Sequence, residues 1–266
     1  AMPCRAIPIE NAGMKTAHYP SLEGRSVFVT GGSSGIGADI VVGFARQGAK
    51  VAFTGRNAEA AAKVLAEASA IGPTPLFLQS EASDVAALQA AIAQAAAAHG
   101  DISVLVNNVA NDARHDIMDV TPEDFDWRVS INLRPAFFAA QAVVPGMRRM
   151  GGGAIVNLGS VSWMIKGRGY PVYGTCKSAT VGLTRCLARD LGPDNIRVNT
   201  LTPGWIMTEK QLTHWVDAEG ERLMDDNQCL PGRVMGADVA HMALFLAADD
   251  SRMVTAQDFV VDAGWT

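Results

Sequence analysis

Cysteine is scarce in this chain, which has 4 cysteines among its 266 residues. Cys4, Cys176, Cys186 and Cys229 lack the spacing of a metal site or of a disulfide framework. The histidines likewise do not pair at the separation that metal ligands need. The sequence therefore predicts no metal centre, and we expect a reducing compartment, the cytoplasm, to be the default location.

Charge of one sign and long apolar runs are also lacking. The formal net charge is −5 with the two signs interspersed, so no basic face of the kind that binds nucleic acid is expected. The longest apolar runs are too short to span a bilayer, and we expect no membrane partner. Residues 1–20 lack the charged-then-apolar pattern of a signal peptide, and we expect them to form a flexible tail.

The chain does contain an alternation of strand and helix signals. The predicted strands lie near residues 26–30, 50–55, 75–80, 103–107, 153–159, 195–201 and 256–261. Hydrophobic residues make up 48% of the chain, which suits a parallel sheet that is covered on both faces. We predict an α/β fold, with one doubly wound, Rossmann-type parallel sheet of about seven strands in a single domain spanning 21–266.

A glycine-rich segment, Thr30 to Gly37, connects the first predicted strand to a helix. The spacing of Gly31, Gly35 and Gly37 differs from the commoner dinucleotide fingerprint. A strand, a tight glycine turn and a helix N-terminus nevertheless form a site in which backbone N–H groups and the helix dipole hold a pyrophosphate. The segment therefore predicts dinucleotide binding.

Tyr173 and Lys177 are four residues apart, and Ser160 precedes Tyr173 by thirteen positions. Four residues make about one helical turn, so both side chains project from the same face of a helix. A tyrosine that acts as a base at neutral pH needs its pKa lowered from about 10, and a nearby ammonium supplies part of that change. Ser160, at the end of a predicted strand, is placed to hydrogen-bond the oxygen whose charge changes in the reaction. Alone, a tyrosine and a lysine at this spacing are ordinary surface neighbours, but with the serine and the glycine segment they predict a catalytic site.

These motifs resemble those of the short-chain dehydrogenase/reductase family, which has TGxxxGxG near its start and YxxxK further on. The resemblance implies that Tyr173 is the base, that Ser160 holds the substrate, and that Lys177 activates the tyrosine and binds ribose. It also implies that Asn132, in the segment SINLRPAF, anchors a proton-relay water. A homotetramer, built through the long helices after the fourth and fifth strands, is implied as well.

The resemblance extends to the residues around the cofactor. Asn107 and Asn108 match the NNAG turn of the family, although Val109 and Ala110 replace its alanine and glycine, so the backbone there loses freedom. The cofactor contacts that we predict are Gly31, Ser33, Ser34, Gly35, Ile36, Gly37, Arg56, Glu81, Ala82, Asn108, Val109, Tyr173, Lys177, Pro203, Gly204, Ile206 and Thr208.

The end of the second predicted strand indicates which dinucleotide is preferred. NAD enzymes of this architecture usually place a carboxylate there to bind the ribose 2′-hydroxyl, whereas this chain has Gly55 and Arg56. A guanidinium suits a 2′-phosphate, so we predict NADP, with NAD as the alternative. Arg56 would instead stack on adenine in either cofactor if this interpretation is wrong. Glu81 matches the adenine-binding carboxylate of the family, and Asp84 is the competing candidate, although it is better suited to cap the next helix.

The variable segments resemble a narrower group, the bacterial aldose 1-dehydrogenases of the D-xylose and L-arabinose type. They include Asn111 to His115 and the stretch 205–233, which is a mobile lid in the family. Amides and a guanidinium offer partners for sugar hydroxyls, and tryptophans offer flat faces for C–H edges. The predicted substrate contacts are Asn111, Arg114, Ser160, Trp163, Tyr173, Trp205, Gln211 and Trp215. Alternatively, the tryptophans pack the lid or a subunit contact.

These observations predict an oxidoreductase that transfers a hydride from C1 of an aldose to a nicotinamide and yields an aldonolactone. Relatives of this sugar-oxidising type usually carry an acidic residue where Gly55 stands, so the cofactor could have changed while the substrate class stayed the same. One alternative is a carbonyl or 3-oxoacyl reductase of the same family. Another, from a different class, is a dinucleotide-binding regulator without catalysis.

Overall fold

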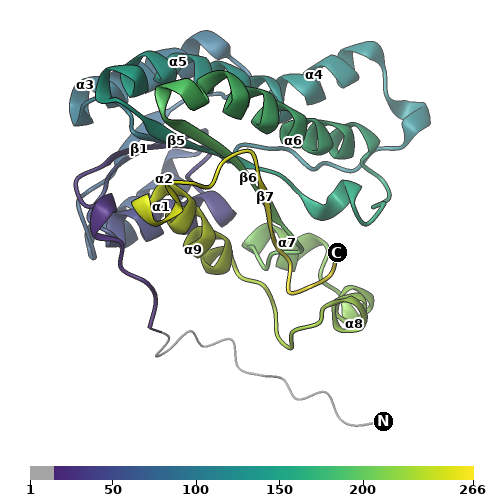
Figure 1. Cartoon of the computed structure of the whole chain (residues 1–266). Helices are drawn as coiled ribbons and strands as arrows, with labels where there is room; N and C mark the ends of the chain where they lie inside the picture. Colours follow the sequence, from purple (N-terminus) through teal and green to yellow (C-terminus); the bar gives the residue numbers. More distant parts are fainter. Residues whose placement is uncertain (1–14) are drawn as a thin grey trace.

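Short apolar segments form the strands of one sheet in the computed structural model, which describes residues 15–266 (Figure 1). The strands are β1 (Ser26–Thr30), β2 (Lys50–Gly55), β3 (Leu76–Gln79), β4 (Val104–Asn107), β5 (Gly153–Leu158), β6 (Ile196–Pro203) and β7 (Asp258–Val261). Their order across the sheet is β3-β2-β1-β4-β5-β6-β7, and each neighbouring pair is parallel. The predicted doubly wound α/β fold is therefore confirmed.

Helices cover both faces of this sheet (Figure 1). They are α1 (Gly35–Arg46), α2 (Ala58–Ser69), α3 (Val85–His99), α4 (Pro122–Asn132), α5 (Arg134–Met150), α6 (Pro171–Leu191), α7 (Glu209–His214), α8 (Ala218–Asn227) and α9 (Gly236–Ala247). On one face lie α1, α2 and α9, and on the other lie α3, α5 and α6. Between β6 and α9, the short helices α7 and α8 stand apart from these layers.

The strand residues alternate between two apolar cores. Val27 and Val29 of β1 pack with the α1 and α9 side, while Phe28 between them packs with α3 and α5. In β4, Leu105 faces the second core and its neighbours face the first. Since successive strand residues point to opposite faces, both faces of a central strand must be apolar here.

The chain before β1 is attached to the domain over part of its length. The side-chain oxygen Oε1 of Gln47 accepts a hydrogen bond from the Tyr19 backbone at 2.7 Å, and its amide donates to the Ala17 carbonyl at 3.0 Å. Leu22, in a single 3-10 turn (Pro20–Leu22), is fully buried. The predicted flexible tail is thus held to α1 from Ala17 onward, and its residues 1–14 lie outside the described part of the chain.

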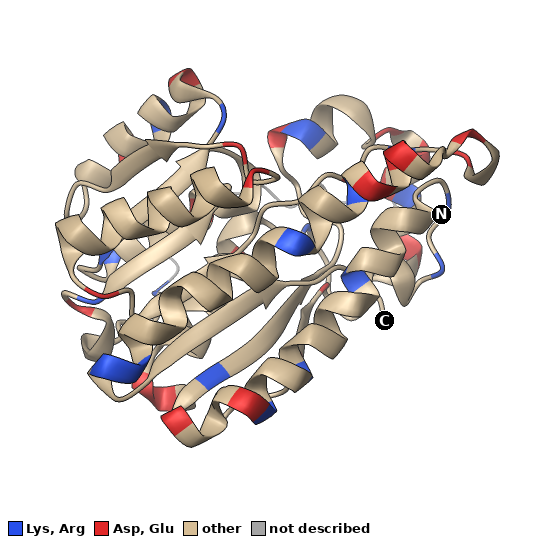
Figure 2. Ribbon diagram, turned by 90° about the horizontal axis from the view of Figure 1, so that it is seen from above, with Lys and Arg blue, Asp and Glu red and all other residues tan. Residues whose placement is uncertain are grey.

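Charged side chains of both signs are interspersed over the ribbon (Figure 2). Between residues 15 and 266, no helix has the length and apolar character needed to cross a membrane. The same residues hold no group of three or more His, Cys, Asp or Glu that could bind a metal ion.

Candidate active site

The glycine turn after β1 is shaped by close backbone approaches. Gly31 and Gly35 have φ values of +69° and +54°, in the left-handed region that favours glycine. A Cβ atom on Gly37 would lie 2.1 Å from the Gly31 carbonyl oxygen. Asn108, at the end of β4, fixes this turn because its amide donates to the carbonyls of Thr30 at 3.1 Å and Gly31 at 2.9 Å. The N-terminus of α1 is thereby left open towards a neighbouring cavity.

This cavity has a volume of about 430 Å³ and lies at the carboxyl edge of the sheet, beside β1 and β4. The strand order reverses at these two strands, and ligands of open α/β sheets bind at such a point. The predicted cofactor residues that line the cavity are Gly31, Ser33, Ser34, Ile36, Gly37, Arg56, Glu81, Ala82, Asn108, Val109 and Thr208. The other predicted cofactor residues, Gly35, Tyr173, Lys177, Pro203, Gly204 and Ile206, do not line it. Asp112, Trp127 and Lys210 also line the cavity and were not predicted from the sequence.

At the far end of the cavity, the residues around β2 form a small polar group. Arg56 and Glu81 make an exposed ion pair, with 3.6 Å between the guanidinium and the carboxylate. The Ser33 hydroxyl lies only 2.4 Å from the position that a Cβ atom on Gly55 would take. Asp84 caps α3 by accepting a hydrogen bond from the Ala87 backbone at 3.0 Å, as its position in the sequence predicts.

The first two turns of α6 bring Tyr173 and Lys177 to the end of β5. The Lys177 ammonium lies 5.7 Å from the Tyr173 ring centroid and donates a hydrogen bond to the Leu158 carbonyl at 2.7 Å. Ser160, just after β5, hydrogen-bonds Tyr173 and accepts a bond from the Ser162 backbone at 3.2 Å. The structure therefore brings together the serine, the tyrosine and the lysine that the sequence singled out.

Burial dominates the ionisation of the tyrosine and the lysine. It raises the pKa of Tyr173 above its ordinary value, and the hydrogen bond with Ser160 opposes this only in part. It also lowers the pKa of Lys177 to about 8. The predicted lowering of the tyrosine pKa is thus absent in the protein alone, because the surroundings disfavour phenolate and ammonium alike.

Asn132, the last residue of α4, is buried, and its side chain is fully engaged. Its Oδ1 accepts a hydrogen bond from the Asn111 backbone at 2.7 Å, and its amide donates to the carbonyls of Asn111 and Arg128, both at 3.0 Å. The side chain therefore ties the loop after β4 to α4. Asn132 and Lys177 also line a small cavity of about 10 Å³, on the order of the space that one water needs.

The predicted substrate residues mostly contact one another through the lid. The Arg114 guanidinium lies 4.0 Å from the Tyr170 ring centroid and 4.9 Å from that of Trp215. Gln211 accepts a hydrogen bond from the Trp205 indole at 2.9 Å. The Trp205 ring centroid also lies 6.2 Å from that of Trp265. Trp205 therefore packs within the lid region in this structure, which is the alternative role that we considered for the tryptophans.

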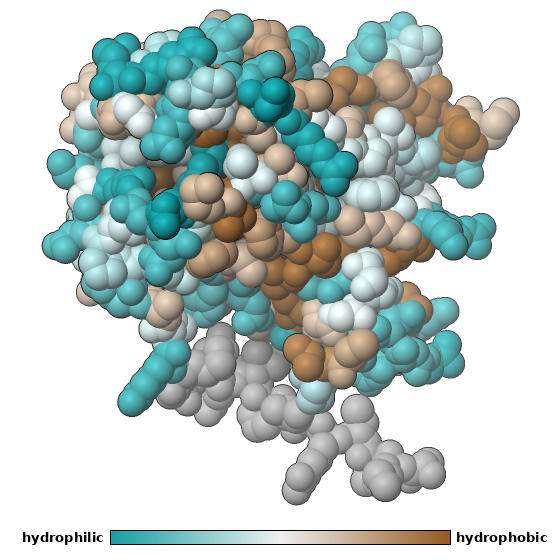
Figure 3. Space-filling model, in the orientation of Figure 1, coloured by the Kyte–Doolittle hydropathy of each residue, from teal (hydrophilic) through white to brown (hydrophobic). Residues whose placement is uncertain are grey.

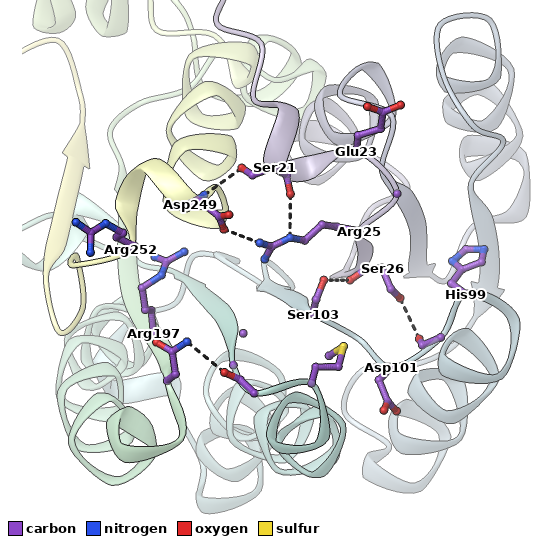
Figure 4. Close-up of a pocket in the computed structure, with 17 residues that line it drawn as sticks. Ser21, Glu23, Arg25, Ser26, His99, Asp101, Ser103, Arg197, Asp249 and Arg252 are labelled. Atoms are coloured by element: carbon purple, nitrogen blue, oxygen red, sulfur yellow. Dashed lines mark hydrogen bonds and ion pairs between the residues drawn. The ribbon is translucent and has the colours of Figure 1, made fainter.

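A larger cavity, of about 600 Å³, lies at the opposite, amino edge of the sheet (Figure 4). Arg25, Arg197 and Asp249 are among its lining residues, and Arg25 donates a hydrogen bond to Asp249 at 2.6 Å. The predicted site residues are all absent from its lining. Because ligands of doubly wound sheets bind at the carboxyl edge, we assign the chemistry to the smaller cavity.

Comparisons with known proteins agree with this geometry. A family model described as Enoyl-(Acyl carrier protein) reductase matches residues 31–266. A D-xylose 1-dehydrogenase of Caulobacter vibrioides is 43% identical over 252 residues, which cover 95% of this chain and 100% of the relative. A protein of Rhizobium meliloti named "Probable galactose dehydrogenase GalD" is 44% identical over 252 residues, which cover 94% of this chain and 98% of the relative.

Solved structures share the fold. A short-chain type dehydrogenase/reductase from Mycobacterium ulcerans has a TM-score of 0.87 and 29% identity, and the match covers 92% of this chain and 90% of that chain. A blue fluorescent protein from a metagenomic library, solved in complex with NADPH, has a TM-score of 0.85 and 37% identity, with coverages of 92% and 99%. This protein therefore belongs to the short-chain dehydrogenase/reductase family, whose members are oxidoreductases that bind NAD(P).

Proposed function

We propose that the protein is an aldose 1-dehydrogenase that oxidises the anomeric carbon of a cyclic sugar to an aldonolactone. The observation that carries this proposal is the grouping of Ser160, Tyr173 and Lys177 near the loop after β4 and the lid. Asn111 on this loop and Gln211 in the lid line the cavity and offer amide groups for hydroxyl groups of the substrate. The sugar dehydrogenases of Caulobacter and Rhizobium, with their full-length similarity, support the same substrate class.

The glycine turn fits a dinucleotide. A Cβ on Gly37 would meet both the Gly31 carbonyl and, at 2.5 Å, the Asn108 amide, so glycine lets the N-terminus of α1 pack closely on the turn, where its N–H groups can hold a pyrophosphate. When bound, an oxidised nicotinamide would supply the hydride acceptor and a positive charge. That charge is what the buried Tyr173 lacks in the protein alone, because it would favour phenolate.

The residues of the chain then have separate tasks. Tyr173 takes the proton of the C1 hydroxyl while C1 gives up its hydride, and Ser160 hydrogen-bonds the same oxygen as the C–O bond becomes a carbonyl. Lys177 and Asn132, which share the one-water cavity, return the proton towards solvent. The lactone leaves when the lid opens.

We further propose that NADP is preferred over NAD. Arg56 and Ser33 line the far end of the cavity, and no carboxylate stands at position 55 to bind a ribose 2′-hydroxyl. The NADPH complex of the blue fluorescent protein supports this choice by analogy. Glu81 opposes it in part, because a 2′-phosphate must compete with this carboxylate for Arg56.

A carbonyl or 3-oxoacyl reductase is the second candidate. The description of the matching family model and the exposed lid residues Leu212, Leu223 and Leu230 favour an apolar acyl substrate. A screen of pentoses, hexoses and acyl thioesters with both cofactors, followed at the nicotinamide absorbance, distinguishes the two. Reduction of a thioester without oxidation of any sugar would refute the aldose proposal, and cofactor binding without any turnover would favour a silent regulator.

We propose a homotetramer as the assembled form. Exposed apolar side chains gather on the side of the molecule where α4 and the lid lie (Figure 3). Exposed apolar residues from the turn before α4 to the start of α5 include Met118, Phe125, Trp127 and Phe137, which are between 44% and 87% exposed. A patch of this kind marks a protein contact more often than open surface, which supports an interface that includes α5, the long helix after the fourth strand. The other helix that the resemblance implies is α6, after the fifth strand.

A further inference from the structure

Asp112 lies on the loop after β4 and was not among the predicted site residues. Its two carboxylate oxygens both face α7. Oδ1 pairs with the Lys210 ammonium, and Oδ2 accepts a hydrogen bond from the Gln211 amide at 3.2 Å. The Asp112 side chain is 26% exposed and that of Lys210 is 55% exposed, so the carboxylate is the more shielded partner of the pair.

Helix α7 is short and lies on the surface of the domain. It has six residues, and none of them is buried. A helix of this length is unstable alone, because nucleation outweighs the few hydrogen bonds gained. Its contacts with Asp112 join it to a loop about one hundred residues earlier in the chain. The Asp112 carboxylate, which receives Lys210 and Gln211, is therefore one of the contacts that join α7 to the domain.

The loop that carries Asp112 is itself well anchored. On one side, the Asn111 backbone is held by the buried Asn132 side chain. On the other, His115 accepts a hydrogen bond from the Val172 backbone at 3.2 Å, next to the catalytic Tyr173. Between these two anchors, Asp112 contacts α7, which belongs to the lid.

The same contact positions the residues that face the substrate. Gln211 binds Asp112 through its amide nitrogen and the Trp205 indole through its oxygen. Trp215 follows α7 directly and stacks on Arg114, which lies two residues after Asp112. Displacement of α7 would thus move Gln211 and Trp215 together.

We propose that Asp112 is a positioning residue that holds α7 against the loop after β4, where both line the cavity, and thereby sets the affinity for the substrate. The identity of the substrate rests on the proposed function, whereas the role of Asp112 in holding α7 does not. Asp112 takes no part in proton or hydride transfer. Its loss should therefore weaken substrate binding while leaving the chemical step largely intact.

The kinetic test compares Asp112→Asn, Lys210→Met and the double variant in the full-length protein with the best aldose from the screen. Each single variant should raise KM for the sugar about tenfold, with kcat changed less than about threefold. Because both residues act through one contact, the double variant should be no worse than the poorer single variant. Glu219→Gln, an exposed carboxylate on α8, serves as the control and should behave as the wild type.

A second measurement needs no sugar. Hydrogen exchange of the backbone amides of residues 209–216 should be faster in Asp112→Asn and in Lys210→Met than in the wild type, and unchanged in Glu219→Gln. Asp112→Glu, which keeps the charge, should restore slow exchange. Wild-type exchange rates in both neutral variants would overturn the proposal, as would a fall in kcat with an unchanged KM. If no aldose is oxidised, the proposed function fails, and the exchange rates alone then decide the role of Asp112.

Discussion

At the residue scale, the hydroxyl of Tyr173 and the ammonium of Lys177 occupy one buried environment that favours the neutral form of each. Such a pair is a poor base until further positive charge arrives. We therefore expect catalysis to be coupled to binding of the oxidised cofactor, since its positive charge would make phenolate accessible near neutral pH.

Tyr173→Phe tests the role of the phenol. Without a group to take the hydroxyl proton, turnover should fall by about 10²- to 10⁴-fold, while the dissociation constant of the cofactor stays within about twofold. Steady-state kinetics and cofactor titration by fluorescence measure the two quantities. Tyr170→Phe, on a ring 5.8 Å away, is the matched control and should retain most activity. Unchanged turnover in Tyr173→Phe would rule out the assigned base.

Arg56→Ala tests the cofactor preference. Loss of the guanidinium should lower kcat/KM for NADP about tenfold and leave kcat/KM for NAD nearly unchanged, because only NADP carries a 2′-phosphate. Arg46→Ala, at the far end of α1, is the control. An equal loss with both cofactors would instead indicate that Arg56 stacks on adenine.

At the scale of elements, Asp39 of α1 packs against Gly236, the first residue of α9. Burial and the nearby Glu67 of α2 raise the pKa of its carboxyl to about 6. A carboxyl whose pKa is raised on folding binds its proton more tightly in the folded state. Its contribution to stability is therefore most favourable at low pH and is lost as pH rises through about 6.

Asp39→Asn should consequently stabilise the protein at pH 8 and have no such effect at pH 4. Since the side chain keeps some contact with water, we expect a gain of about 1 kcal/mol, or a melting temperature higher by about 2–4 °C. Thermal unfolding across this pH range measures the difference between variant and wild type. Asp126→Asn, at an exposed site on α4, is the control. An equal shift at both pH values would show that ionisation of Asp39 is not the cause.

The sequence predicted those elements whose signals are local. Apolar runs located the seven strands, and Asp84 was correctly expected to cap α3. The glycine turn and the spacing of Tyr173 and Lys177 located the centre of the site for the same reason. The lid contacts could not be predicted, because Asp112 and Lys210 are 98 positions apart and their pairing depends on the path of the chain between them.

At the scale of the whole molecule, the exposed aromatic residues of α4 and α5 should be covered by a second subunit. Phe137→Glu would place a charge in that contact, and the assembly should dissociate into smaller species, as measured by light scattering during size-exclusion chromatography. Ile71→Glu changes an exposed apolar residue after α2 in the same way and should leave the assembly intact. A monomeric wild type would contradict the proposed tetramer.

The closeness of Ser33 to Gly55 affects how the preference between NAD and NADP could evolve. A carboxylate residue introduced at position 55 would place its Cβ 2.4 Å from the Ser33 hydroxyl, so Ser33 would have to move or be replaced before the carboxylate could reach a ribose. Two segments more than twenty residues apart are therefore coupled in this choice. A lineage that drifts one substitution at a time would pass through an intermediate that serves neither dinucleotide well, and this barrier would tend to preserve whichever preference its ancestor had.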